Sequence, residues 1–378
     1  MLAADEAAAA DPLLAAPQYF SAGEMHAPPG WHYPETDVHM RFDHWLSSDS
    51  TNWTHASKLY ESSGVFDGTD RRGSTWAPMA AYDPADDHWH LFYVAYRASP
   101  DYRIKLGLYS NKSLHYYTQW DGEIWHAVSS VKGSGSAGIS GPYVDVGPIL
   151  DQEGLGGYSA SKDAWEGDHG VDMFFPFLTK QHGWLGLYGS EFGKFGAFCG
   201  DDPANHGHTC RQVGLAQIDS GGGDQPKQLT ATSLRGQPRA SAAAASTGGL
   251  ADGRWSRLSN LNPLDKAFRP AVPGIENPVV IQSQDKQWYI AVYHIYTGAS
   301  IGVSFSRDGR TWTRQPGDVL LGSDYCGNSV TTACGLVAEP TLGKGVYSLL
   351  YTARGKCGKV DCPLESTCRA YLVNKAES

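Results

Sequence analysis

Residues Thr75-Trp-Ala-Pro-Met-Ala-Ala-Tyr82 are followed by the sequence DPADD and then by His88-Trp-His-Leu-Phe-Tyr-Val94. Aromatic and β-branched side chains are enriched in β-strands, and a short run of Asp and Pro is typical of a turn. The stretch therefore predicts two antiparallel strands that are joined by a tight turn.

The same order of strand, polar turn and aromatic strand recurs three more times along the chain. The recurrences occupy residues 170–188, 274–293 and 336–351, and His26-Ala-Pro-Pro29 is a degenerate opening that precedes all of them. Repetition of this kind indicates a repeat architecture. Five units of irregular size are therefore predicted.

Two segments with the spacing Ser-x-Asp-x-x-x-Trp close units of this kind. In Ser47–Trp53 and Ser306–Trp312 we expect a Ser/Asp turn to place the tryptophan on the next strand. Each unit then forms a four-stranded antiparallel meander. The predicted fold is all-β, a five-bladed β-propeller whose blades surround a central axis and whose ring closure leaves no long sheet edge exposed. A β-sandwich with separate modules is the alternative.

Composition supports this fold class and excludes several kinds of partner. The 378 residues include 12 Trp, 20 Tyr, 12 Phe, 44 Gly and 21 Pro, which is typical of short aromatic strands joined by turns and leaves no long amphipathic helix. The net charge of −10, with scattered basic residues, argues against a nucleic-acid partner. No apolar run approaches the roughly 20 residues that span a bilayer, so no membrane partner is expected. A monomer is expected.

The ends of the chain and its cysteines bear on organisation and compartment. Residues 1–18 are predicted to be a flexible Ala-rich tail, and residues 19–378 a single propeller domain with a low-complexity insertion at about 220–253. The first residues carry acids where a secretory signal carries bases, so we expect a secreted protein whose signal has been removed. Sequons at Asn52 and Asn111 fit that route. The seven cysteines lack a convincing zinc-binding spacing, and short-range disulfides with one thiol left over are expected.

Several of these motifs resemble those of the five-bladed propeller glycoside hydrolases, the superfamily that holds the family 43 arabinanases and xylosidases and, more distantly, the family 32 fructan hydrolases. Trp76-Ala77-Pro78 matches the opening of the second blade in family 43. Residues 171–175 match the third opening with Met173 in place of Pro, and residues 275–278 match the fourth with Asn277 in place of Gly. The Ser-x-Asp-x-x-x-Trp turns match as well. The resemblance implies the same fold for residues 25 to 370 and a glycosidase activity.

The resemblance also implies two catalytic carboxyl groups. Glycoside hydrolysis needs a carboxylic acid that protonates the leaving oxygen and a carboxylate that activates water or attacks the sugar. By resemblance, Glu276 is the general acid, and Asp172 orients it and favours its protonated form. The first strands of the blades line the axis of a propeller, so one acid per blade can reach a shared cavity. The alternative is that both are turn or edge carboxylates bonded to backbone.

The position of the general base departs from the family pattern. Where the family has an Asp-Pro in the first blade, this chain has Ala27. Asp37 and Asp43, in the sequence TDVHMRFDHW, are the candidate replacements, ahead of Glu24. Absence of any base is a further alternative. Glu339, in Ala338-Glu339-Pro340, is a candidate for an axial role as acid or substrate-binding residue.

Aromatic and acidic side chains supply the remaining candidates. Trp31, Trp76 and Trp165 offer flat apolar faces on which a sugar could stack, with core packing as the equal alternative. No metal-ligating residue is assigned, and no cofactor is expected to be required. An acidic run before the third opening has the oxygen ligands of a structural calcium ion, although such runs are more often solvated loops. It comprises Asp163, Glu166, Asp168, His169 and Asp172.

Three functions are compatible with these features. The first is a glycoside hydrolase that cleaves a poly- or oligosaccharide, with an inverting mechanism expected from the family 43 resemblance. The second is a catalytically inactive carbohydrate-binding propeller, which the alanine at position 27 favours. The third is a sialidase-like propeller, because Ser306–Trp312 approaches the Asp-box turn; it would need three arginines converging on a carboxylate.

Overall fold

The computed structural model describes these residues: 18–21, 41–48, 52–62, 70–96, 122–151, 171–192, 210–218, 249–252, 254–258, 263–264, 275–295, 300–317, 329–357 and 360–373. Within them the chain is almost entirely β-structure. The one α-helix among these residues is the short α2 (Ser136–Ser140). None of the helices in this part of the chain has the length and apolarity needed to cross a membrane.

The strands form five antiparallel sheets, called blades 1 to 5 in chain order. Blade 1 is β1 (Gln18–Ser21), β2 (Arg41–Leu46) and β3 (Thr54–Glu61). Blade 2 is β4 (Ser74–Asp83), β5 (His88–Tyr96), β6 (Gly122–Lys132) and β7 (Tyr143–Leu150). Blade 3 is β8 (Val171–Thr179), β9 (Gly183–Phe192), β10 (Cys210–Ile218) and β11 (Trp255–Arg257). Blade 4 is β12 (Ile275–Gln282), β13 (Tyr289–Ile295), β14 (Ser300–Ser306) and β15 (Trp312–Arg314), and blade 5 is β16 (Ser329–Ala338), β17 (Val346–Cys357) and β18 (Val360–Val373).

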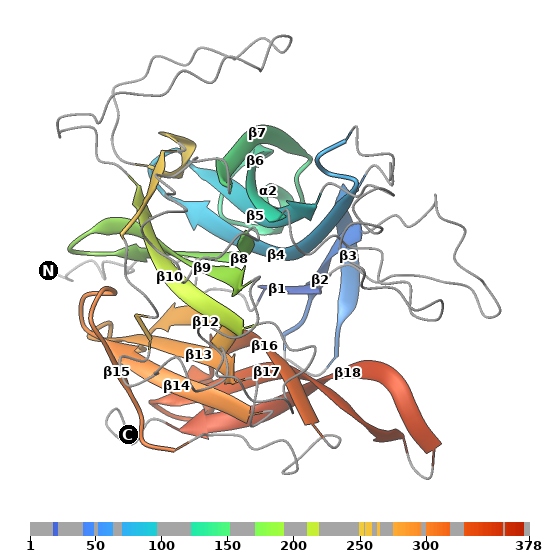
Figure 1. Cartoon of the computed structure of the whole chain (residues 1–378), viewed down its shortest axis with the longest axis vertical. Coiled ribbons are helices and arrows are strands. Elements are labelled where there is room, and N and C mark those ends of the chain that lie inside the picture. The colour runs from blue at the N-terminus through green and yellow to red at the C-terminus, as the bar shows by residue number, and fades with distance from the viewer. Residues whose placement is uncertain are drawn as a thin grey trace, which may run out of the picture.

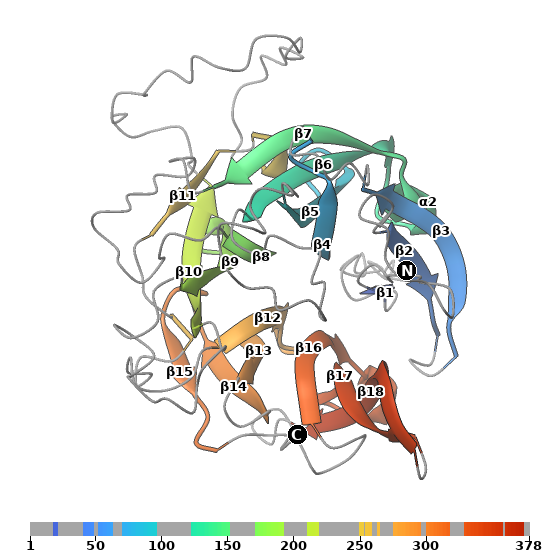
Figure 2. The ribbon, with the colours of Figure 1, turned by 45° about the vertical axis from the view of Figure 1, so that its right-hand side comes forward.

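The first strand of each blade lies nearest to a common centre. Strand β4 contacts β1 and β8, and β12 contacts β8 and β16, so the first strands meet their neighbours around the ring. Figures 1 and 2 show the later strands of each blade lying progressively further out. This confirms the five-bladed propeller, with four strands in blades 2 to 4 and three described strands in blades 1 and 5.

Apolar side chains between neighbouring blades make the core. One cluster joins blades 2 and 3 and includes Phe92, Phe174 and Trp255. Another joins blades 4 and 5 and includes Val292, Ile290, Leu336 and Tyr351. Because both faces of a blade are covered by its neighbours, the inner strands are apolar along most of their length, as in the fully buried run Tyr289–Ile295.

The predicted turn at Ser306–Trp312 joins β14 to β15 as expected. Asp308 Oδ1 accepts hydrogen bonds from the backbone N–H groups of Arg310 and Thr311, at 2.9 and 2.7 Å. Although burial opposes ionisation, these bonds hold the pKa of Asp308 below its usual value. Trp312 is buried, and its indole N–H donates to the Gly309 carbonyl at 2.9 Å. The motif therefore works by anchoring a turn.

The glycine of this turn gives a first testable prediction. Gly309 has φ of +78°, and a Cβ there would lie 2.8 Å from Thr179 Cγ2 and 2.9 Å from Phe177 Cε2. Gly317 has φ of +80°, but its Cβ would meet nothing within 4 Å. Gly309→Ala should therefore lower the free energy of unfolding by about 1–3 kcal/mol more than Gly317→Ala, measured by chemical denaturation. Equal losses would show that the turn does not pack tightly on blade 3.

Several expectations are refined or remain untested. Strand β16 begins at Ser329, so Ala338-Glu339-Pro340 ends the first strand of blade 5 instead of opening it. The predicted opening at residues 26–29, and residues 219–248 of the predicted insertion, lie outside the described residues. Disulfide pairing and the limits of the single domain stay predictions.

Candidate active site

The opening of β12 carries a bulge that sets the position of Glu276. Glu276 pairs with His294 and Val279 pairs with Val292, so Asn277 and Pro278 together lie opposite one residue of β13. Asn277 has φ of +49°, a left-handed conformation that Asn tolerates better than most residues, and Pro278 has no N–H to lose from the ladder. A bulge of this kind re-aims the side chain beside it.

The opening of β4 has the same construction in blade 2. Trp76 pairs with Val94 and Met79 with Phe92, and Ala77, at φ of +47°, precedes Pro78. Left-handed backbone at a residue other than glycine costs about 1–3 kcal/mol and is concentrated at functional sites. Trp76 is thus the blade 2 counterpart of Glu276. It is half-buried and packs against the core between blades 2 and 3.

Glu276 is buried with a histidine partner. Glu276 is only 5% exposed to solvent. Its Oε1 lies 3.1 Å from Nδ1 of His294, which is also buried. Val292 and Ile290 of β13 pack against blade 5. Alternate residues of a strand point to the same face, so His294 lies on that face as well. The pair therefore lies on the blade 5 side of blade 4, at the opening end of the inner strand. The two groups lie within hydrogen-bond distance of each other.

Asp172 and Glu276 occupy neighbouring positions at the ends of two inner strands. Asp172 is the extra residue of the β8 bulge, because Val171 pairs with Ser190 and Met173 with Gly189. The backbone N–H of Asn277 donates to Sδ of Met173 at 2.8 Å. The residue after Asp172 therefore touches the residue after Glu276. The two openings meet although they are about a hundred positions apart in the sequence.

Asp43 lies on β2, the middle strand of blade 1, and is buried. Its Oδ2 accepts a hydrogen bond from Arg41 Nε at 2.8 Å, and its Oδ1 lies 3.0 Å from His55 Nε2. These ion-pair contacts account for its burial without a catalytic role. The structure does not bring Asp43 to the first strand of its blade.

Glu339 lies at the opposite end of the propeller from Glu276. It follows the last residue of β16 and accepts a hydrogen bond from Ser348 Oγ at 2.6 Å. The turn it belongs to contacts the β12–β13 turn, because Gln284 accepts from the Gly345 N–H at 3.0 Å. Glu276 is instead the second residue of β12. The structure thus separates these two acids, and we call the two ends of the inner strands the opening end and the turn end.

The remaining predicted site residues lie outside the described part of the chain. They are Asp37, Trp31, Trp165 and the acidic run at Asp163, Glu166, Asp168 and His169. Among the arginines weighed for a sialidase-like site, Arg41 binds Asp43, Arg71 binds Glu123 and Arg72 binds Asp145. Within the described residues these three serve separate ion pairs in blades 1 and 2.

Glu123 is a half-buried carboxyl that the sequence did not single out. Burial raises its pKa, while hydrogen bonds from Arg71 and Trp125 oppose that shift. Arg71 Nε donates to Glu123 Oε1 at 2.9 Å. Glu123 belongs to β6, the third strand out from the axis, so it is part of the ion pairs of blade 2 and is no alternative general acid.

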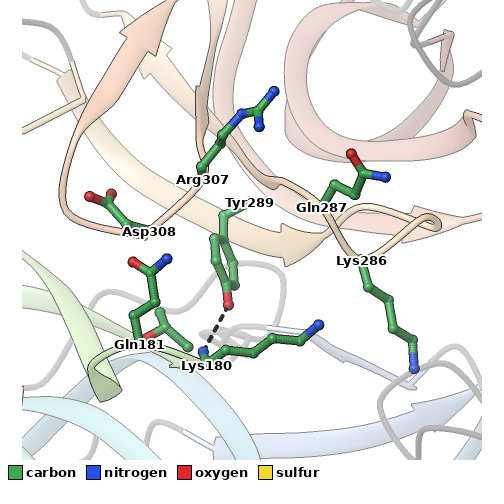
Figure 3. A pocket seen from close by; sticks show the side chains of 8 residues that line it. Lys180, Gln181, Lys286, Gln287, Tyr289, Arg307 and Asp308 are labelled. Carbon is green, nitrogen blue, oxygen red and sulfur yellow. Dashed lines mark hydrogen bonds between the residues drawn. The ribbon is translucent and has the colours of Figure 1, made fainter.

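A shallow cavity of about 290 Å³ lies at the turn end, between blades 3 and 4. Figure 3 shows the side chains of Lys180, Lys286 and Arg307 around it, with Tyr289 accepting a hydrogen bond from the Lys180 backbone N–H at 3.3 Å. Asp308, the carboxylate that lines this cavity, accepts backbone hydrogen bonds within the Ser306–Trp312 turn. The cavity therefore has no paired carboxyl groups and lies away from the opening end.

His294 is the site residue that sequence reasoning missed. The available signal was a lone basic side chain near the end of an otherwise apolar strand, Tyr289–Ile295. Recognising it as the partner of Glu276 requires the register of β12 against β13, which the bulge shifts. Composition and motif spacing do not contain that register.

No protein-family model matches the chain, and no curated protein matches it. Among solved structures, an endo-arabinase from Bacteroides thetaiotaomicron is similar at 12% identity, with 90% of each chain covered and a TM-score of 0.45. A thermostable family-43 glycoside hydrolase is similar at 12% identity, covering 89% of this chain and 83% of that one, with a TM-score of 0.47. A β-fructofuranosidase from Schwanniomyces occidentalis is similar at 12% identity, covering 81% of this chain and 44% of that one, with a TM-score of 0.43. These similarities carry no conclusion about activity, which depends on the residues described above.

Proposed function

We propose that the protein is a glycoside hydrolase that cleaves a poly- or oligosaccharide at the opening end of the propeller. The observation that carries this proposal is the buried Glu276, held by a bulge on an inner strand, bonded to His294 and adjacent in space to the position of Asp172. The motifs at Trp76-Ala77-Pro78 and Ser306–Trp312 support it by their resemblance to propeller glycosidases.

Glu276 acts in this proposal as the general acid. Its carboxyl group, which His294 Nδ1 holds at 3.1 Å, would protonate the leaving glycosidic oxygen. Asp172, on the neighbouring inner strand, orients the acid. Trp76 occupies the equivalent bulge of blade 2 and offers an aromatic face to the sugar ring.

The general base in this proposal is Asp37, since Asp43 is engaged by Arg41 and His55. An inverting mechanism requires the two carboxyl groups to stand about 6.5–9.5 Å apart, which leaves room for a water molecule. We also propose a secreted protein, supported by the exposed position of Asn52 in its sequon.

One observation favours a second candidate, a propeller that binds carbohydrate without hydrolysing it. Ala27 stands where the family pattern has its base, and Asp43 forms ion pairs away from the first strand. In that case the opening end would bind a sugar and release it unchanged. Turnover separates the two candidates.

The experiment is a screen of the purified protein on arabinan, xylan, galactan and fructan oligosaccharides, with products separated by chromatography. We expect the protein to cleave at least one of these oligosaccharides. Trp76→Ala should lower kcat/KM for that substrate by the equivalent of about 1–3 kcal/mol, because a stacking face is lost. Trp288→Ala is the control, since Trp288 lies at the turn end beneath Arg307. Binding without cleavage would establish the second candidate, and an effect of Trp288→Ala equal to that of Trp76→Ala would place the sugar elsewhere.

A further inference from the structure

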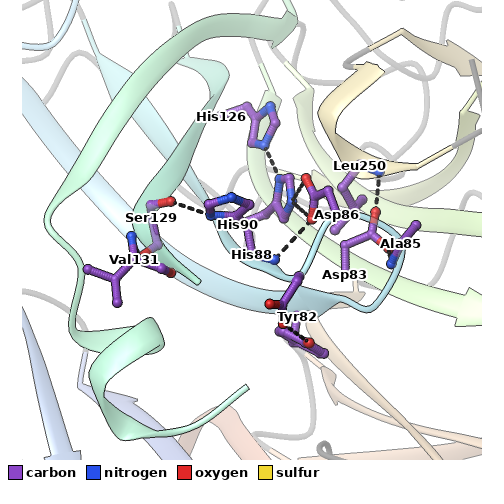
Figure 4. A network of polar contacts seen from close by, with 11 residues as sticks. Tyr82, Asp83, Ala85, Asp86, His88, His90, His126, Ser129, Val131 and Leu250 are labelled. Carbon is purple, nitrogen blue, oxygen red and sulfur yellow. Dashed lines mark hydrogen bonds and ion pairs between the residues drawn. The ribbon is translucent and has the colours of Figure 1, made fainter. Parts of the chain in front are cut away.

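The turn between β4 and β5 brings two carboxylates and an imidazole together. Asp83 ends β4 and is 1% exposed, Asp86 lies within the turn, and His90 is on β5 and fully buried. His90 Nε2 lies 3.1 Å from Asp86 Oδ2, and the ligand atoms of all three residues lie within 4.8 Å of one another. Figure 4 shows these side chains converging beside the turn.

Backbone groups fix both carboxylates in place. Asp83 Oδ1 accepts from the Ala85 N–H at 2.9 Å, and its Oδ2 accepts from the Leu250 N–H at 2.6 Å. Asp86 Oδ1 accepts from the His88 N–H at 3.0 Å. A carboxylate oxygen has two lone pairs, so each keeps capacity to bind a cation. The two groups are thus held in orientation by bonds that leave that capacity in place.

A second imidazole contacts His90 on the side of its ring away from Asp86. His126 Nε2 lies 2.7 Å from His90 Nδ1, and the two rings stack with centroids 5.0 Å apart. Nδ1 of His126 is buried and has no hydrogen-bond partner within the described residues. The chain of contacts from Asp86 through His90 therefore ends at His126.

This chain allows His90 to bind a cation at Nε2. When His90 donates its Nδ1–H to Nε2 of His126, the lone pair on its own Nε2 faces the Asp86 carboxylate at 3.1 Å. In the other tautomer Nε2–H donates to Asp86, and a cation bound by both groups would replace that hydrogen bond. Metal-bound histidines almost always donate their second ring N–H to a neighbouring group, and His126 is placed to receive it.

We propose that Asp83, Asp86 and His90 form a binding site for one divalent transition-metal ion, with zinc as the best fit. An imidazole nitrogen with two carboxylates suits zinc, whereas calcium and magnesium take oxygen ligands. Ligand atoms around a tetrahedral zinc ion stand about 3.3–3.6 Å apart, so the His90–Asp86 separation of 3.1 Å would have to widen by only a few tenths of an ångström. The Asp86 side chain is 27% exposed, which leaves the fourth position open to water.

The site joins parts of the chain that lie far apart in sequence. Leu250, whose N–H binds Asp83, belongs to a short 3-10 helix that precedes the last strand of blade 3. A metal ion would therefore tie the turn of blade 2 to the segment at 249–252. Asp83 is the last residue of β4, whereas Trp76 lies near the start of that strand. The ion would therefore lie at the other end of β4 from the candidate active site and would stabilise the fold.

The test compares the chelated full-length protein with two variants by zinc titration calorimetry and thermal melting. We expect a zinc-dependent rise in melting temperature, and Asp86→Asn and His90→Gln to weaken zinc binding at least about tenfold. The matched controls are His88→Gln, because His88 contacts the Ser129 carbonyl, and Asp285→Asn, in the corresponding turn of blade 4. Both controls should bind zinc like the parent.

Two outcomes would overturn the proposal. One is zinc binding that Asp86→Asn leaves unchanged, which would assign the ion to cysteines or histidines outside this turn. The other is an anomalous-scattering peak, in crystals of the zinc-loaded parent, that lies away from His90 Nε2. Asp86 is partly exposed, so its variant should fold even where the buried His90→Gln does not.

Discussion

Glu276→Gln is expected to lower kcat on a natural oligosaccharide by about 10²–10⁴-fold, because the amide keeps the shape of the side chain but has no proton to give. The loss should depend on the leaving group. An activated aryl glycoside, whose leaving group departs without protonation, should be cleaved at a rate much closer to that of the parent. Steady-state kinetics on the two substrate types measures the difference.

The control for that prediction is Glu339→Gln. Glu339 is also partly buried and hydrogen-bonded, but it lies at the turn end with Ser348. It should keep turnover close to that of the parent. Loss of activity in Glu339→Gln with full activity in Glu276→Gln would contradict the assignment of the opening end as the active site.

Phe174→Ala is expected to lower the free energy of unfolding by about 3–5 kcal/mol, the range for truncating a well-packed buried aromatic side chain. Phe174 is 1% exposed and lies 5.2 Å from the ring of Phe92 and 4.7 Å from the ring of Trp255, edge to face. Its ring also fills the space over Gly186. Removing it leaves a cavity between blades 2 and 3, which neighbouring strands cannot close.

Leu178→Ala is the control on the same strand. Leu178 is 40% exposed, so its truncation should change the free energy of unfolding by no more than about 1 kcal/mol. Urea denaturation followed by tryptophan fluorescence measures both variants. A loss below about 1 kcal/mol for Phe174→Ala would mean that the two blades do not pack as described.

Much of the fold could be predicted from the sequence because turn chemistry and strand periodicity are local. The hairpin at residues 75–94, and those around residues 170–188 and 274–293, appear in the structure as the first two strands of blades 2, 3 and 4. The turn at Ser306–Trp312 depends on hydrogen bonds within six residues, so its motif contains all that is needed. The opening of blade 5 could not be placed, because Ala338-Glu339-Pro340 looks like an opening but follows ten residues of strand.

The candidate site was less predictable because it depends on pairing between strands. Glu276 stands out in the sequence only by resemblance, and its partner His294 depends on a register that a bulge shifts. In the sequence, the stretch DPADDHWH that holds Asp83, Asp86 and His90 predicts only a turn and the start of a strand. Its possible chemistry depends on His126, which lies 36 positions away and is brought close by the pairing of β5 with β6.

We expect a sugar to bind at the opening end, between Trp76 and Glu276. The most direct test is a crystal structure of Glu276→Gln with an oligosaccharide that the parent cleaves or binds. We expect a sugar ring against Trp76, with a glycosidic oxygen within about 3 Å of the side-chain amide at position 276. A sugar bound instead at the turn-end cavity beside Lys180 and Arg307 would contradict it.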